Sequence, residues 1–240
     1  MNLWSRLVTC VLLSVVLLPA AGVAEDLLSQ GLAAHKAGQH AQAVEMLGKY
    51  LQDHPEAVEA LRRRAQSLAS LQRQAEALAE LDQGIARHSQ DINLLLARGA
   101  LLAELDRREE ACQVYSQVIS LAPQNAEAWK EKGVNLAKVG KFDEALINLN
   151  KAAEMSPQDP WVFNERGMVK FCQNNYQGAV DDFTAAIKLN PELPLSYFFR
   201  GSLYLHHLNQ KEKAVADFKE GCRQGHPLCC GELEKMAGSK

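Results

Sequence analysis

The sequence has no excess of positive charge. Lys and Arg number 26 against 29 Asp and Glu, which gives a formal net charge of −3 with neutral histidines. A protein that holds a nucleic-acid backbone by charge carries a basic patch that neutralises phosphates. We therefore expect no nucleic-acid partner.

The sequence also lacks the short motifs that carry common enzyme chemistry. It contains no HExxH pair, no GxSxG, no glycine-rich phosphate loop and no CxxCH. The histidines are scattered, and the adjacent pair His206-His207 would point in different directions on a helix. We therefore expect no catalytic residues, no cofactor and no enzymatic activity.

Long apolar runs are rare, and the one that stands out is Leu7–Leu18. Arg6 precedes it, and Pro19 and a group of small residues follow it. A positive start, an apolar middle and a small-residue end are typical of a secretory signal. We predict that residues 1–24 are this signal, cleaved after Ala24. The same small residues leave cleavage after Ala21 or Gly22 open as alternatives.

An uncleaved membrane anchor is the other interpretation of this run, although it is short for a span of roughly 20 residues. Both interpretations place the rest of the chain outside the cytoplasm. We expect export, to a bacterial periplasm or by secretion, with no stable membrane insertion once the signal is cleaved. No linker or low-complexity segment follows residue 24, so we expect one domain.

Residues 126–159 show how the rest of the chain is built. Apolar residues recur at helical spacing over the first half, Gly140 interrupts them, and a second helical pattern begins at Phe142 and stops before Pro157. Gly133 and Ala145 carry little or no side chain, so they predict where the two helices cross closely. The segment reads as a helix hairpin that needs neighbours to bury its apolar stripes.

The same pattern returns every 34 residues. The small residue of the first helix recurs at Gly31, Ala65, Gly99, Gly133, Gly167 and Gly201. The alanine of the second helix recurs at Ala43, Ala77, Ala111, Ala145 and Ala179, then one residue late at Ala214. The helix stop recurs at Pro55, Ser89, Pro123, Pro157 and Pro191. Three registered columns at one period indicate an internal repeat.

A 34-residue helix-turn-helix repeat with these columns resembles the tetratricopeptide repeat (TPR) family. The resemblance implies an all-α solenoid of about six hairpins over residues 25–226, with repeats near 24–57, 58–91, 92–125, 126–159, 160–193 and 194–226. Residues 227–240 read as a capping helix and tail, with Leu228, Leu233 and Met236 packed on the last repeat.

Five cysteines follow the signal, and three of them lie near the C-terminus. Cys222 and Cys230 resemble the pair that links successive helices in bacterial TPR-like and Sel1-like repeats, which implies a Cys222–Cys230 disulfide, with Cys229 as the alternative partner. A metal site from these cysteines and His226 is disfavoured, because no CxxC is present. By their repeat columns, Cys112 is expected in the core and Cys172 partly exposed.

The family resemblance also implies where a partner binds. In TPR proteins the first helix of each repeat lines an inner groove. Carried over by position, the groove residues are Trp161, Asn164, Met168, Phe171, Phe198, Leu205, Lys130 and Val134. Some TPR proteins hold a terminal carboxylate with Lys and Asn one turn apart, but Val134 stands one turn after Lys130 here. An apolar or amphipathic segment suits this groove better, although large apolar residues at helical spacing are also typical of core.

Three functions fit this reading. The first is an extracytoplasmic scaffold that binds a protein or peptide in the groove. The second is an assembly factor of an envelope complex that self-associates. The third is a metal or redox carrier that uses the C-terminal cysteines. The arginines that share one column (Arg98, Arg166 and Arg200) are expected to be structural.

Overall fold

A computed structural model describes residues 20–238, and the predicted signal segment up to residue 19 lies outside them. The described residues form thirteen α-helices and no strand. The predicted all-α repeat fold is therefore confirmed. Helix α1 begins at Ala20, inside the segment assigned to signal cleavage.

The described residues divide into two compact units, 20–80 and 81–238. The first contains α1 (Ala20–Lys36), α2 (His40–Asp53) and α3 (Val58–Ser70), together with the start of α4 (Gln74–Arg87). Helix α1 packs against α2, and α2 packs against α3. This unit thus begins with a helix hairpin followed by the first helix of the next hairpin.

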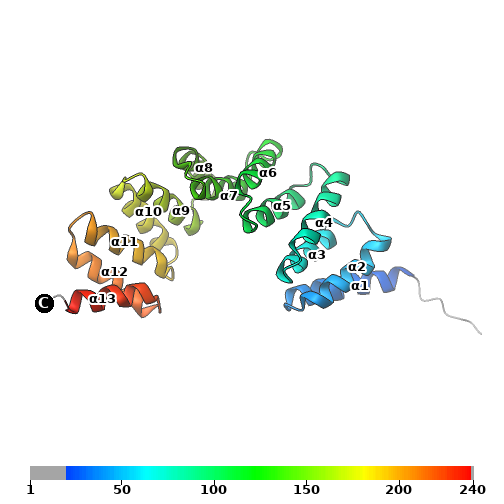
Figure 1. Cartoon of the computed structure of the whole chain (residues 1–240), viewed down its shortest axis with the longest axis horizontal. Helices are drawn as coiled ribbons and strands as arrows, with labels where there is room; N and C mark the ends of the chain where they lie inside the picture. The colour runs from blue at the N-terminus through cyan, green and yellow to red at the C-terminus, as the bar shows by residue number, and fades with distance from the viewer. Residues whose placement is uncertain (1–19, 239–240) are drawn as a thin grey trace, which may run out of the picture. The chain divides into compact units, whose positions relative to one another are not determined.

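The second unit continues in the same way, and Figure 1 shows its helices following one another from green to red. Each hairpin pairs two successive helices, and the second of each pair contacts the first of the next. The helices are α5 (Ile92–Glu104), α6 (Arg108–Leu121), α7 (Ala126–Lys138), α8 (Phe142–Met155), α9 (Pro160–Cys172), α10 (Tyr176–Leu189), α11 (Pro194–His206), α12 (Lys211–Arg223) and α13 (Pro227–Gly238).

Small residues let the helices of a hairpin cross closely. A Cβ built on Gly133 would lie 2.8 Å from Leu149 Cγ and 3.1 Å from the Ala145 carbonyl oxygen. Leu149 and Ala145 are both fully buried. The same contact recurs between Gly167 and the buried Phe183. The predicted crossing is confirmed, because the large side chain sixteen residues later needs the space that glycine leaves.

The turn inside each hairpin contains one residue with positive φ. Gly140 has φ of 80°, as its predicted position at a helix end suggests, and Gly38 has φ of 74°. Polar residues occupy the equivalent turn elsewhere, namely Gln72, Asp106, Asn174 and Asn209. Asn and Asp tolerate this region better than other non-glycine residues. The turn before α12 holds four residues, 207–210, so its positive-φ residue comes one position late.

Side-chain caps begin three of the first helices at the 34-residue period. Asp91, Asn125 and Asp159 each accept a hydrogen bond from a backbone N–H of the turn that follows, at 2.9 to 3.0 Å. Such a cap satisfies a donor that the helix leaves free, and it is worth about 1 kcal/mol. Pro160 follows the last of these caps at the first helical position, where its missing N–H costs nothing.

Helix α13 covers the end of the last hairpin, as expected of a cap. Leu233 and Met236 pack against the buried cluster of Ala214, Phe218 and Cys229, but Leu228 is 57% exposed and the prediction for it was wrong. Cys229 takes the inward position instead and is fully buried. Cys229, Leu233 and Met236 share one helix face at spacings of four and three, which Leu228 misses by one residue.

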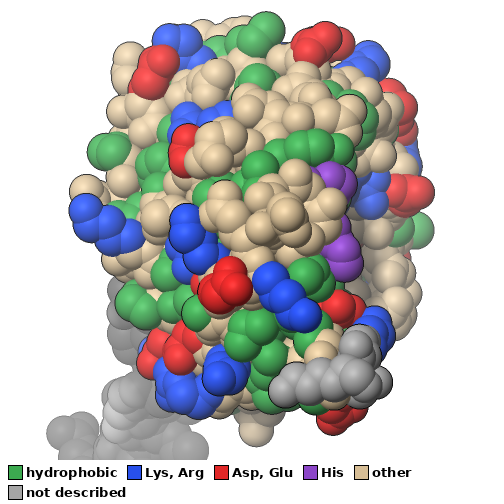
Figure 2. All heavy atoms as spheres, turned by 90° about the vertical axis from the view of Figure 1, so that its left-hand side faces the viewer, with side chains coloured by type: hydrophobic (Ala, Val, Ile, Leu, Met, Phe, Trp, Pro, Cys, Tyr) green, Lys and Arg blue, Asp and Glu red, His purple; other side chains and the backbone are tan. Residues whose placement is uncertain are grey.

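The face at the C-terminal end carries hydrophobic, acidic and basic side chains interspersed with one another (Figure 2). Over the face in view, charges of one sign do not gather into a large patch. Among the described helices, none has the length and apolar character that crossing a membrane requires.

Candidate binding pocket

The second unit contains a pocket of about 300 Å³ between the first helices of three successive repeats. Helix α9 forms its centre, α7 and α11 flank it, and Phe142 and Leu149 of α8 complete the lining. The lining residues are Val134, Ala137, Lys138, Phe142, Leu149, Asn164, Glu165, Met168, Val169, Cys172, Leu195 and Phe199. Most of them are apolar, so the pocket is suited to an apolar group.

Helix α9 presents a stripe of four side chains along this side. Trp161, Glu165, Met168 and Cys172 lie four, three and four residues apart, which places them on one helix face. Trp161 is 51% exposed, and Cys172 is exposed at the other end. The stripe therefore has a solvent-exposed side chain at each end, Trp161 and Cys172, and pocket-lining residues between them.

A polar pair fixes the floor between α9 and α11. Ser196 Oγ donates a hydrogen bond to Asn164 Oδ1 at 2.8 Å. Both side chains are almost completely buried, with exposed fractions of 1% and 2%. Unpaired, either group would carry a desolvation cost of about 1–3 kcal/mol. The pair therefore holds the two helices in a fixed relation beneath the pocket.

Glu165 is the one carboxylate among the lining residues. Burial raises the pKa of this carboxyl, because the ionised form loses hydration, and the negative charge of Glu131 acts in the same direction. The positive charges of Lys138 and Lys130 and a side-chain hydrogen bond with Asn164 oppose the rise. The pocket therefore holds an acid whose charge the protein compensates only in part.

The structure brings three of the eight predicted groove residues into this pocket, namely Val134, Asn164 and Met168. Trp161 lies beside it on the α9 stripe. Lys130 is less than a quarter exposed and lies between Glu131 and Asp159, at 3.6 and 3.8 Å. Val134 replaces the polar residue that a carboxylate clamp would need.

The other predicted groove residues pack against neighbouring helices. The Phe171 ring lies 6.1 Å from that of Tyr176 and 5.9 Å from that of His207. Phe198 and Leu205 pack in the cluster that joins the last hairpin to the cap, around Phe218. Phe171 thus packs against the core of α10 and α11, whereas Phe198 and Leu205 pack against the core of α12 and α13.

Nine of the twelve lining residues are absent from the predicted set, and two of these nine, Leu195 and Phe199, come from α11. Both follow from the repeat: Leu195 is 34 residues after Trp161, and Phe199 is 34 residues after Glu165. Sequence reasoning selected Phe198 because it shares the column of Asn164. Adjacent phenylalanines on one helix differ by about 100° in direction, and only packing decides which one faces the pocket.

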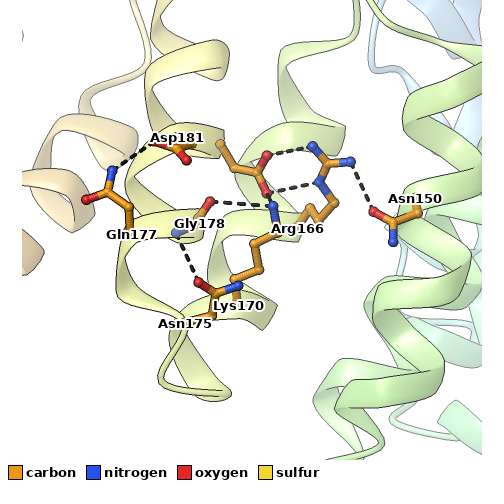
Figure 3. Close-up of polar contacts among 8 residues, drawn as sticks. Asn150, Arg166, Lys170, Asn175, Gln177, Gly178 and Asp181 are labelled. Carbon is orange, nitrogen blue, oxygen red and sulfur yellow. Dashed lines mark hydrogen bonds and ion pairs between the residues drawn. The ribbon is translucent and has the colours of Figure 1, made fainter.

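A polar ladder joins the repeats away from the pocket. Arg166 donates to both carboxylate oxygens of Asp182, at 2.9 and 2.6 Å, and to Asn150 Oδ1 of the preceding repeat at 3.0 Å. Figure 3 shows the Arg166 guanidinium between Asn150 of α8 and the Asp182 carboxylate of α10. Lys170 lies beside the same carboxylate. Arg200 repeats the arrangement with Asp217 and Thr184.

The arginines at this repeat position bind different partners when the residue sixteen positions later is not acidic. Arg64 binds Glu80 sixteen residues later, but the equivalent partner position for Arg98 is Val114. Arg98 binds Asp82 of the preceding second helix instead, at 2.6 Å. The structural interpretation of the arginine column is confirmed, because each guanidinium ties one second helix to a first helix.

The cysteines fall into three environments. Cys222 and Cys230 lie with their Cα atoms 4.8 Å apart and their sulfur atoms at bonding distance, which suits a disulfide. Cys229 is buried against Gly221, and burial raises the pKa of its thiol to about 11. Cys112 is half-buried, not fully in the core as predicted, because it borders a polar cleft between α6 and α7. Cys172 is exposed, as expected.

No group of three or more His, Cys, Asp or Glu side chains among the described residues could hold a metal ion. Near the cap, Cys229 turns inward and His226 stacks beside the Phe198 ring at 5.4 Å. Cys229 is packed in the cap, and the sulfur atoms of Cys222 and Cys230 lie at bonding distance from each other.

Two family models and a large set of solved structures match this chain. The model of a tetratricopeptide repeat matches residues 165–227, and the model of ChAPs (Chs5p-Arf1p-binding proteins) matches residues 16–176. Curated protein sequences give no match. Together with the hairpin fold, these models define the class: a tetratricopeptide-repeat protein. The ChAPs model covers about two thirds of the chain, so the chain belongs to the family that this model describes.

Solved structures agree with this fold. The pilF protein of Pseudomonas aeruginosa is 19% identical, covers 90% of this chain and 98% of its own, and has a TM-score of 0.76. A tetratricopeptide repeat protein from Parabacteroides merdae is 19% identical, with coverages of 85% and 80% and a TM-score of 0.71. YrrB, a TPR protein with a peptide-binding site described as unusual, is 19% identical, with coverages of 80% and 100% and a TM-score of 0.62.

Proposed function

We propose that this protein is an interaction scaffold without enzymatic activity, which binds a segment of a partner protein in the pocket between α7, α9 and α11. The observation that carries this proposal is the pocket itself: an apolar cavity on the first helices of three repeats, bordered by the exposed Trp161. Apolar surface that a folded protein leaves open in a concave site is typical of a binding site.

The comparisons support the same function at a coarser level. TPR proteins are interaction proteins, and YrrB carries a peptide-binding site in its description. The ChAPs family name describes proteins that bind Chs5p and Arf1p. A partner that is a protein or peptide suits a stack of hairpins, because a preformed backbone lowers the entropic cost of ordering on binding.

Photo-crosslinking in living cells tests the proposal. A crosslinking amino acid replaces Leu195, which lines the pocket and is 39% exposed. The matched control replaces Ile147 on α8, which is 63% exposed and does not line the pocket. We expect a discrete partner band from position 195 and not from position 147, and mass spectrometry then identifies it.

A second substitution links the band to the pocket. Phe199→Ala removes an apolar wall and should abolish the crosslink from position 195 while the circular dichroism spectrum stays helical. Equal crosslinking from both positions, or a band that survives Phe199→Ala in a folded protein, would show that the partner does not use the pocket.

We also propose that the scaffold works outside the cytoplasm, with a Cys222–Cys230 disulfide that fastens α13 to α12. The signal-like pattern in residues 1–24 supports export, and the 4.8 Å separation of the two Cα atoms supports the disulfide. A secreted or periplasmic protein meets oxidising conditions. Cell fractionation with N-terminal sequencing tests export; a mature N-terminus at Glu25 is the expected result.

Thiol alkylation of the purified native protein tests the disulfide. Without reductant, we expect Cys172 to react quickly and Cys222 and Cys230 to be unreactive until a reductant is added. Cys229 should react only after unfolding, because it is buried and its pKa is raised to about 11. Rapid alkylation of Cys222 in the oxidised native protein would contradict the disulfide.

A further inference from the structure

The pocket combines apolar walls with one acidic side chain, and this combination selects a kind of ligand. Its volume of about 300 Å³ is at the lower end of the range for ligand sites. The walls come from Val134 and Phe142 on one side and from Leu195 and Phe199 on the other. A cavity of this size and lining takes one large apolar side chain from a longer segment.

Glu165 distinguishes this pocket from a purely apolar one. Among the described residues it forms no ion pair: Lys130 is engaged by Glu131 and Asp159, and Lys138 lines the same pocket with an exposed side chain. The charges that act on this carboxylate are Glu131 against Lys138 and Lys130, and Lys130 is shared with two other acids, Glu131 and Asp159. A carboxylate removed from water without a full partner costs free energy that a ligand cation could offset.

We propose, building on the proposed function, that the pocket binds a peptide segment in which a large apolar side chain is accompanied by a Lys or Arg that pairs with Glu165. The apolar side chain enters between Met168 and Phe199, and the cation lies beside the α9 stripe. An arginine can also stack on the Trp161 ring, which is half exposed at the end of this stripe. Charge complementarity thus gives orientation as well as affinity.

Acidic segments and free C-terminal carboxylates are poor ligands by the same reasoning. Either would bring a second negative charge toward Glu165 and Glu131, and like charges brought together in a partly buried site are repulsive. The one cation among the lining residues is Lys138, whose side chain is exposed and whose positive charge already acts on Glu165. The site therefore discriminates by sign of charge, not only by hydrophobicity.

A panel of matched synthetic peptides tests this inference with the purified full-length mature protein. Each short Ser/Gly peptide carries a fluorophore and blocked ends. The first has a central Phe flanked by Arg, the second replaces Arg by Gln, the third replaces Arg by Glu, and the fourth keeps Arg but replaces Phe by Ala. Fluorescence anisotropy at fixed ionic strength gives the affinities.

We expect the Phe/Arg peptide to bind about tenfold more tightly than the Phe/Gln peptide, in line with one partly buried charge pair. The Phe/Glu and Ala/Arg peptides should bind more weakly still. Glu165→Gln should reduce the preference for Arg over Gln to about one. Glu154→Gln, which removes an exposed carboxylate on α8 outside the pocket, should leave the preference unchanged.

Three results would overturn the inference. One is a Phe/Glu peptide that binds as well as the Phe/Arg peptide, and another is a preference for Arg that survives Glu165→Gln. The third is no binding by any peptide of the panel. In each case the crosslink from position 195 decides separately whether the pocket binds a partner, so the proposed function can stand while the assigned ligand chemistry falls.

Discussion

Helices α3 and α9 occupy the same place in their repeats but present different side chains on the same stripe. On α9 the stripe is Trp161, Glu165, Met168 and Cys172, and on α3 the equivalent residues are Glu59, Arg63, Gln66 and Ser70. Glu59 pairs with Arg63 at 2.8 Å, and Arg63 also donates to Gln66. One stripe is saturated by its own polar pairs, whereas the other borders an open apolar pocket.

Beneath these stripes the two helices agree. Ala65 and Gly167 are both buried, and Arg64 and Arg166 both bind a carboxylate sixteen residues later. The positions that are buried in both repeats therefore maintain the fold, while the residues of the outward stripe differ between them. Binding specificity can therefore change from repeat to repeat without a change of architecture.

The largest expected loss of stability comes from replacing the buried glycine at which the two helices of a hairpin cross. Gly133→Val should destabilise the protein by about 3 kcal/mol, because its Cβ would meet the Ala145 carbonyl oxygen at 3.1 Å and backbone cannot move aside cheaply. Chemical denaturation followed by circular dichroism measures this loss. Glu127→Ala on the exposed face of the same helix is the control and should change stability by less than about 0.5 kcal/mol.

The next largest effect distinguishes a buried ion pair between helices from an exposed ion pair on the surface of α3. Arg166→Met leaves Asp182, which is almost fully buried, with Lys170 as its remaining partner, so we expect a loss of about 2–3 kcal/mol. Arg62→Met removes an i,i+3 pair with the half-exposed Glu59 and should cost about 0.5 kcal/mol or less. Equal losses in urea titrations of the two variants would contradict the distinction.

A smaller and opposite effect is expected at the turns. Gln72 holds φ at 61°, a conformation that glycine adopts without strain, so Gln72→Gly should stabilise the first unit by about 0.5–1 kcal/mol. Asn174→Gly at the equivalent turn should gain less, because Asn already tolerates this region. Thermal unfolding compares the pair, and a lower melting temperature for Gln72→Gly would show that the Gln72 side chain matters more than its backbone.

The smallest effect concerns the pH dependence of Glu165. Its pKa is raised in the folded state, so the folded protein binds the proton more tightly, and stability is lost as pH rises from about 4.3 through the folded pKa. Glu165→Gln should therefore raise the melting temperature modestly at pH 7, and the gain should vanish below about pH 4.

Glu220 provides the control of opposite sign. Arg223 and Gln224 hold the pKa of this exposed carboxyl at about 2, so its contribution is present at neutral pH and is lost as pH falls from about 4.3 toward 2. Glu220→Gln should lower the melting temperature slightly at pH 7 and not at pH 2. If both variants shift in the same direction at pH 7, burial is not what raises the pKa of Glu165.

The sequence alone determined the hairpin period, the crossing residues and the presence of a cap. These features depend on local rules that a single chain displays: glycine or alanine where helices touch, proline or a polar cap where they begin, and a turn residue that tolerates positive φ. Because equivalent residues recur in six repeats, the helix-hairpin pattern can be recognised from the sequence without a structure.

Which apolar side chains remain exposed depends on how the hairpins pack against one another. The sequence presents Phe198 and Phe199 as neighbours of equal hydrophobicity, yet the first packs on the cap and the second lines the pocket. Leu228 and Cys229 are divided in the same way, one exposed and one buried. The rotation of each helix about its own axis decides which of two neighbouring side chains is buried, and contacts between repeats set this rotation. The burial of Glu165 depends on the same contacts, so the chemistry of the pocket emerges only when the hairpins are stacked.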